Sequence, residues 1–143
     1  MIEIDTEILF EELKKARDLS YSPYSNFRVG AVVLTKDGKY ILGTNIENAS
    51  YPLCMCAERN AIYRAYLEGY NRSDIVCIAI YAETENYISP CGACRQVMQE
   101  LLSKNTPIYL FSKNGSHIET NIEELLPFSF SGDDLQWNLV LLV

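Results

Sequence analysis

The chain has 143 residues, 48% of them hydrophobic, which fits one globular domain over residues 1–143 and excludes a disordered chain. Twelve basic residues against 19 acidic ones give a formal net charge of -7, which disfavours binding to nucleic acid. No apolar run approaches the ~20 residues of a membrane helix, and the acidic start lacks a secretory pattern, so we expect a cytoplasmic protein with no membrane partner.

The first half of the chain predicts a helix, a hairpin and a second helix. Residues 6–19 carry apolar side chains at helical spacing, with Thr6 as the expected cap. Residues 27–35 and 40–46 are apolar runs on either side of an Asp-Gly pair, which predicts a β-hairpin. Residues 55–68 again have helical spacing.

The second half alternates strands with helices. We expect strands over residues 75–82 and 108–111, a helix over residues 91–102, and a short helix over residues 121–126. Strands separated by helices imply parallel crossovers, whereas the hairpin adds an antiparallel pair. The pattern predicts an α/β fold with a mixed sheet and helices on its faces.

Five cysteines, an odd number, argue against a disulfide framework. Cys91 and Cys94 are three residues apart at the expected start of a helix, so they can share one metal ion. Cys56 lies near the start of the other helix and would supply a third sulfur, and both helix starts favour thiolates. Three protein ligands would leave the fourth position of a tetrahedral Zn²⁺ open, as in catalytic sites.

Charged residues beside these cysteines suggest a catalytic role. Glu58 follows Cys56 by two residues, so its carboxylate can take a proton from water at the metal and deliver it to a substrate. Three thiolates and one Zn²⁺ carry a net charge of about -1. Arg59 and Arg95 stand next to the ligands, and we hypothesise that they donate hydrogen bonds to the sulfurs and offset this charge.

Simpler interpretations of these residues stay open at this point. The cysteines could be buried apolar side chains, or Cys54 could close a structural zinc site with four sulfurs if it lies in the loop before the helix. Arg59 and Arg95 could be ordinary surface residues. Cys77 is expected in the core and His117 on the surface.

Two segments together match a zinc deaminase pattern: Cys56-Ala57-Glu58-Arg59 and Pro90-Cys91-Gly92-Ala93-Cys94-Arg95-Gln96. The chain also contains Ser22-Pro23-Tyr24-Ser25, Asn45-Ile46-Glu47-Asn48-Ala49, and Leu125-Leu126-Pro127 followed by Phe130. On these residues it closely resembles the small cytidine deaminases from about Tyr21 to Leu135. The resemblance implies a three-layer α/β/α fold with a central mixed five-stranded sheet, one Zn²⁺ per subunit, and a homotetramer with shared active sites.

The reaction that the resemblance implies is hydrolysis of cytidine or deoxycytidine to uridine or deoxyuridine plus ammonia, as in pyrimidine salvage. Water activated by zinc would attack C4, while Glu58 protonates N3 and passes a proton to the departing ammonia. Phe128 stands where the family usually has a small residue, which leaves the packing of the tail near Phe130 open.

The resemblance also assigns the residues that bind the small-molecule nucleoside. Asn45 and Glu47, on alternate positions of a strand, would hydrogen-bond the ribose 3′-hydroxyl as donor and acceptor. Phe27 would pack near the sugar and base. The remaining contacts are Ala57 through its backbone, Tyr51 along the shared site, and Phe130 stacked on the base held by another subunit.

Three other functions compete with this one. A deaminase that edits polynucleotides needs a basic groove for the flanking strand, which the acidic charge disfavours. A non-catalytic module stabilised by zinc would need four protein ligands and no Glu58. A relative acting on a nucleoside-like antibiotic is disfavoured by the ribose-binding pattern at Asn45 and Glu47.

Overall fold

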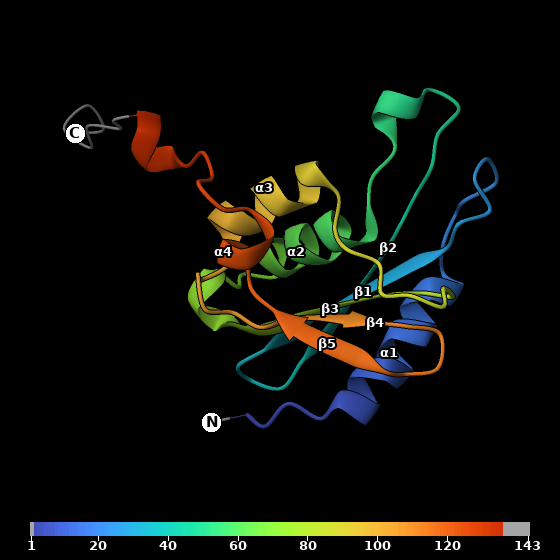
Figure 1. The fold of residues 1–143 in the computed structure, drawn as a ribbon, viewed down its shortest axis with the longest axis horizontal. Helices are drawn as coiled ribbons and strands as arrows, with labels where there is room; N and C mark the ends of the chain where they lie inside the picture. The colour runs from blue at the N-terminus through green and yellow to red at the C-terminus, as the bar shows by residue number, and fades with distance from the viewer. Residues whose placement is uncertain (1, 136–143) are drawn as a thin grey trace.

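A mixed sheet of five strands lies at the centre of the computed structural model, which describes residues 2–135 (Figure 1). In the spatial order β2-β1-β3-β4-β5, its strands are β2 (Tyr40–Thr44), β1 (Val29–Thr35), β3 (Ile75–Ala82), β4 (Ile108–Phe111) and β5 (His117–Thr120). β1 runs antiparallel to β2 and β3, β3 runs parallel to β4, and β4 runs antiparallel to β5. Strands β2, β3 and β4 therefore share one direction.

Helices cover both faces of this sheet. They are α1 (Thr6–Asp18), α2 (Ala57–Leu67), α3 (Gly92–Leu101) and α4 (Ile122–Leu125), with 3-10 turns at Tyr51–Leu53, Arg72–Asp74 and Gly132–Leu135. α1 packs on one face, whereas α2, α3 and α4 lie on the other (Figure 1). The expected three-layer α/β/α fold is confirmed.

The alternation of side chains along β1 explains why two cores form. Ala31 and Val33 point into the core under α2 and α3, while Val32 and Leu34 point into the core under α1. Cys77 on β3 is fully buried in the core under α1, as expected, and burial raises the pKa of its thiol to about 12.

The structure differs from the sequence predictions at two element boundaries and in one further strand. Asp5, not Thr6, caps α1, because its Oδ1 accepts hydrogen bonds from the backbone N–H groups of Glu7 and Ile8. α2 begins at Ala57, because Met55 is extended and pairs with Ile46. Strand β5 was not predicted from the hydrophobic pattern, because it is an exposed edge strand with a largely polar sequence.

Two glycines let the helices approach the sheet closely. A Cβ at Gly30 on β1 would meet the backbone of Leu13 and Arg17 in α1, and a Cβ at Gly43 on β2 would meet the backbone of Ala57 and Ala61 in α2. Gly43 therefore fixes how closely the first turns of α2 lie on the sheet.

None of the helices within residues 2–135 combines the length and the hydropathy that a bilayer crossing requires.

We predict that Gly43→Ala displaces α2, because the new methyl group would overlap backbone atoms that cannot rotate away. Urea unfolding should show a loss of about 2 kcal/mol in the free energy of unfolding. Gly132→Ala is the matched control, since its Cβ would meet only Glu100 Oε1, at 3.9 Å, and should leave stability nearly unchanged. Equal stability of Gly43→Ala and the unchanged protein would contradict the close approach of α2.

Candidate functional site

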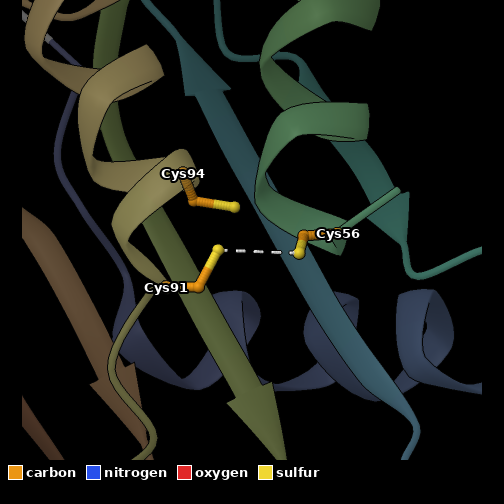
Figure 2. Close-up of side chains that lie close together, drawn as sticks. All are labelled: Cys56, Cys91 and Cys94. Atoms are coloured by element: carbon orange, nitrogen blue, oxygen red, sulfur yellow. Dashed lines mark hydrogen bonds between the residues drawn. The ribbon is translucent and has the colours of Figure 1, made fainter. Parts of the chain in front are cut away.

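Three cysteines converge where α2 and α3 begin. Cys56 is the N-cap residue of α2, Cys91 is the N-cap residue of α3, and Cys94 lies in the first turn of α3. Their Sγ atoms all lie within 4.8 Å of one another, and the Cys56 and Cys91 sulfurs are 3.8 Å apart (Figure 2). Sulfurs bound to one tetrahedral zinc at ~2.3 Å are about 3.8 Å apart, so this donor set fits Zn²⁺.

The electrostatics of the cluster favour thiolates. The sulfurs lie at the N-termini of two helices, whose positive dipole ends favour negative charge there. The pKa of Cys56 is lowered to about 5, first because the Cys94 thiol donates a hydrogen bond to its sulfur, and second because Arg59 also donates to it. The same contact with Cys56 raises the pKa of Cys94, which is the proton donor of this pair. A metal ion would replace that shared proton.

Cys54 lies apart from the other sulfurs. It follows the turn Tyr51–Leu53 in extended backbone, and its Sγ accepts a hydrogen bond from the Asn48 N–H at 3.2 Å. Within residues 2–135, the only group of three or more side chains placed to hold a metal ion is Cys56, Cys91 and Cys94. The geometry therefore favours three protein ligands over a closed site with four sulfurs.

Glu58 is a buried acid in the first turn of α2, with 5% of its surface exposed. Burial raises the pKa of its carboxyl above the ordinary value, while a hydrogen bond with Cys94 opposes this shift. A carboxyl that binds a proton readily beside a metal site is suited to general acid and base chemistry.

Arg59 and Arg95 differ in what they contact. Arg59 Nη2 donates to Cys56 Sγ at 3.5 Å, in agreement with the hypothesis that it offsets sulfur charge. The hypothesis does not hold for Arg95, whose Nε donates to the Pro90 carbonyl at 2.7 Å and whose Nη1 donates to the Leu125 carbonyl. Arg95 therefore ties the residue before Cys91 to the end of α4 instead of contacting a sulfur.

The expected sugar-binding residues lie on either side of a residue that forms β-bridges, Ile46, near the three cysteines. Ile46 exchanges two backbone hydrogen bonds with Met55, the residue before Cys56. On its other side, the same segment pairs with Tyr21 in the loop between α1 and β1. Asn45 and Glu47 stand on either side of Ile46, so these main-chain bonds join them to the start of α2.

The remaining expected contacts lie at backbone or aromatic positions. Ala57 is the first residue of α2, so its N–H has no partner within the helix. The Tyr51 ring lies 6.1 Å from the Tyr24 ring, edge to face, and both are exposed. Phe27 is also exposed, and the Phe130 carbonyl accepts a hydrogen bond from Gln96 in α3 at 2.9 Å.

Phe128 adopts a backbone conformation that favours glycine, with φ of 53°, and its side chain is fully exposed. This explains physically why a small residue suits the position. The segment still returns to α3, since Gln96 holds the Phe130 carbonyl.

Ser20, Ser25 and Gln96 make contacts at the site that the sequence did not predict. Ser20 Oγ donates to Asn45 Oδ1 at 2.6 Å, and Ser25 Oγ donates to Glu47. The motif Ser22-Pro23-Tyr24-Ser25 drew attention to Ser25, but a sequence motif does not show which side chain accepts the hydrogen bond from its hydroxyl.

Comparison with known proteins gives consistent matches. The family model described as "Cytidine and deoxycytidylate deaminase zinc-binding region" matches residues 4–110. The chain is 49% identical to a cytidine deaminase of Halalkalibacterium halodurans, over 92% of this chain and 98% of that one, and 44% identical to one of Sporosarcina psychrophila, over 94% and 97%. The crystal structure of a cytidine deaminase from Burkholderia pseudomallei is similar with a TM-score of 0.85 and 46% identity, covering 89% of this chain and all of that one.

We predict that Cys54→Ala retains zinc and that Cys94→Ala loses it, because only the second removes a sulfur of the cluster. Zinc affinity should fall more than ~100-fold in Cys94→Ala, since outer contacts alone are worth ~10–100-fold. Metal analysis of the purified variants after dialysis against a chelator measures this. Loss of zinc from Cys54→Ala would show that Cys54 is a ligand.

Proposed function

Because the chain belongs to the cytidine and deoxycytidylate deaminase family, we propose that it hydrolyses cytidine and deoxycytidine to uridine and deoxyuridine, releasing ammonia. The observation that carries this proposal is the cluster of three sulfurs at two helix starts, with the buried acid Glu58 in the first turn of one of them. In a cell, this reaction would belong to pyrimidine salvage. The five cysteines, three of them gathered as metal ligands, support a reducing cytoplasmic location.

Cys56, Cys91 and Cys94 would hold Zn²⁺, one ion per chain. A zinc ion held there supplies Lewis acidity, which makes water a nucleophile at neutral pH. Arg59 donates a hydrogen bond to Cys56 and so withdraws charge from a ligand set whose net charge would be about -1.

Glu58 moves the protons in the proposed reaction. Its carboxylate accepts one proton from the attacking water and delivers it to N3 of the base, while the hydroxyl group adds to C4. It then carries the remaining hydroxyl proton to the 4-amino group, which leaves as ammonia. Burial supports this role, because the carboxyl then binds and releases protons nearer to neutral pH than an exposed carboxyl does.

Asn45 and Glu47 have the free capacity that a sugar hydroxyl requires. Asn45 Oδ1 accepts from Ser20 and Val29, and its Nδ2 donates to the Phe27 carbonyl, so one amide hydrogen remains. Glu47 accepts three hydrogen bonds from Tyr24 and Ser25, which leaves a lone pair on Oε2. A hydroxyl group accepts one hydrogen bond and donates one, and this supports binding of the 3′-hydroxyl.

We further propose a homotetramer whose active sites are shared between subunits. Phe27, Tyr51 and Phe130 expose 45–70% of their surface on segments beside the site, and a second copy of the chain would cover them. Phe130 would then stack on the base held by a neighbouring subunit, and Tyr51 would line the shared site.

We predict that sedimentation equilibrium gives four times the mass of one chain. Phe130→Ala and Glu58→Gln subunits should each be nearly inactive alone, and mixing them should restore part of the activity, because a mixed assembly contains sites with both intact residues. A monomer in solution, or no recovery on mixing, would contradict a shared site.

The function is tested by following the loss of cytosine absorbance with purified protein. Cytidine and deoxycytidine should react, while CMP and an oligonucleotide containing cytosine should not, since the chain carries a net charge of -7. Reaction of the oligonucleotide alone would favour an editing deaminase instead.

Glu58→Gln should lower kcat for cytidine ~10²–10⁴-fold, the usual contribution of a general acid and base, with zinc retained. Glu7→Gln, at an exposed acid in the first turn of α1, is the matched control and should keep full activity. Full activity of Glu58→Gln would exclude the proposed proton transfer.

A further inference from the structure

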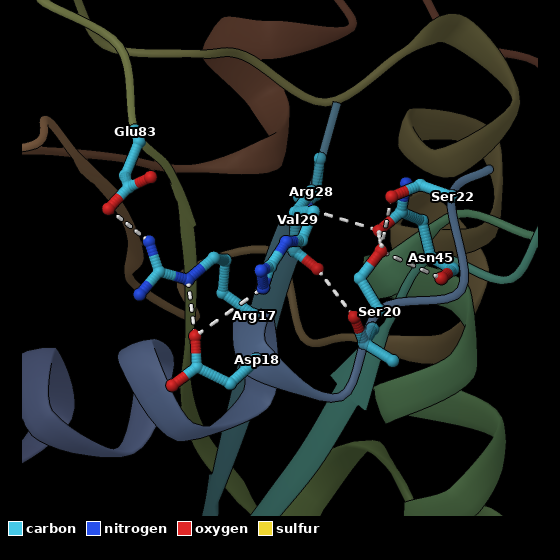
Figure 3. Close-up of polar contacts among 9 residues, drawn as sticks. Arg17, Asp18, Ser20, Ser22, Arg28, Val29, Asn45 and Glu83 are labelled. Atoms are coloured by element: carbon cyan, nitrogen blue, oxygen red, sulfur yellow. Dashed lines mark hydrogen bonds and ion pairs between the residues drawn. The ribbon is translucent and has the colours of Figure 1, made fainter. Parts of the chain in front are cut away.

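The loop between α1 and β1 is fastened to the segment that carries Asn45 and Glu47. Tyr21 N donates to the Asn45 carbonyl at 3.1 Å, and Glu47 N donates to the Tyr21 carbonyl at 2.8 Å. Figure 3 shows the Asn45 side chain between Ser20, near the start of this loop, and Val29, the first residue of β1. The same view shows Arg17 paired with Asp18 and Glu83, which anchors the end of α1 from which the loop departs.

Glu47 is held by the middle of the loop. Its Oε1 accepts hydrogen bonds from the backbone N–H groups of Tyr24 at 3.0 Å and Ser25 at 3.1 Å. Its Oε2 accepts a hydrogen bond from the Ser25 hydroxyl. The two backbone hydrogen bonds position Oε1 of the carboxylate. The Ser25 hydroxyl then fixes the rotation of the carboxylate group and so positions Oε2.

Ser25 also contacts the residue expected to pack near the sugar and base. Its Oγ accepts a hydrogen bond from the Phe27 N–H at 3.0 Å while donating its only hydrogen to Glu47. The Phe27 carbonyl accepts from Asn45 Nδ2 at 2.7 Å. The backbone of Phe27 is therefore held on both sides, by Ser25 and by Asn45.

We propose that Ser25 is a positioning residue for nucleoside binding, whose hydroxyl orients the Glu47 carboxylate toward the substrate 3′-hydroxyl. The proposal rests on the proposed function. Ser25 touches no reacting atom, so it acts on the binding of substrate and not on the transfer of protons at Glu58.

The role of Ser25 predicts a selective defect. Ser25→Ala leaves the two backbone hydrogen bonds to Glu47 Oε1 in place, but Oε2 loses its donor and the carboxylate can turn. We expect KM for deoxycytidine to rise about tenfold, the usual effect of one hydrogen bond to a charged group, with kcat within about twofold. For 2′,3′-dideoxycytidine, which lacks the 3′-hydroxyl, the same substitution should change kcat/KM less than about twofold.

The experiment measures kcat and KM of the zinc-loaded protein with both nucleosides, and treats dideoxycytidine as a competitive inhibitor where its turnover is too slow to follow. Ser25→Thr keeps a hydroxyl and should recover most of the binding. Ser22→Ala is the matched control from the same loop, since the Ser22 hydroxyl contacts only the Ser20 hydroxyl, at 3.1 Å, and does not touch Glu47. Ser25→Ala combined with Glu47→Gln should bind deoxycytidine no worse than Glu47→Gln alone, because Ser25 acts through Glu47.

Several outcomes would overturn the proposal. An equal loss with deoxycytidine and dideoxycytidine would mean that Ser25 only holds the loop together, and no loss with either would mean that it orients nothing. If Ser25→Ala does not fold, as judged by circular dichroism and zinc content, then failure of Ser25→Thr to bind deoxycytidine normally would count against it. If the unchanged protein deaminates neither cytidine nor deoxycytidine, the proposed function fails first and this inference fails with it.

Discussion

The site depends on one topological constraint: the two helices that carry the sulfurs begin at the same edge of the sheet. Strands β2 and β3 run in one direction, because both are antiparallel to β1. α2 follows β2 and α3 follows β3, so both helices start beyond the carboxyl ends of these strands, where open α/β sheets bind their ligands. Two positive helix ends then lie beside three sulfurs, and Gly43 keeps the first turns of α2 close to the sheet.

Main-chain pairing builds the other half of the site. Ile46 is bonded to Met55 on one side and lies in the segment paired with Tyr21 on the other, so the residues expected to bind the sugar are tied to the N-terminus of α2. Asn45 and Glu47 make hydrogen bonds with the loop before β1 and with the start of β1, and the proposed sugar contact would use the amide hydrogen and the carboxylate lone pair that remain. Such a site is organised before substrate arrives, which lowers the entropy lost on binding.

The sulfur cluster was predictable, since Cys91 and Cys94 are three residues apart at one helix start and Cys56 stands at a second, in a pattern that resembles the zinc deaminases. The hairpin and the parallel crossover were equally predictable, because strong turn and periodicity signals mark them. Contacts between distant segments were not predictable. Because Arg95 is next to Cys94 in sequence, we expected it to donate a hydrogen bond to a sulfur, but its guanidinium donates to the Leu125 carbonyl at the end of α4 instead. The edge strand β5 has no apolar pattern to reveal it, because water covers most of its side chains.

The central claim is that three sulfurs hold the metal and leave one position for water beside Glu58. Zinc K-edge X-ray absorption on the purified protein, loaded with one zinc per chain, measures the coordination directly. The account predicts three sulfur neighbours at ~2.3 Å and one oxygen or nitrogen neighbour at ~2.0–2.2 Å. Four sulfur neighbours would contradict it, because a closed site has no position left for the water that the proposed reaction requires.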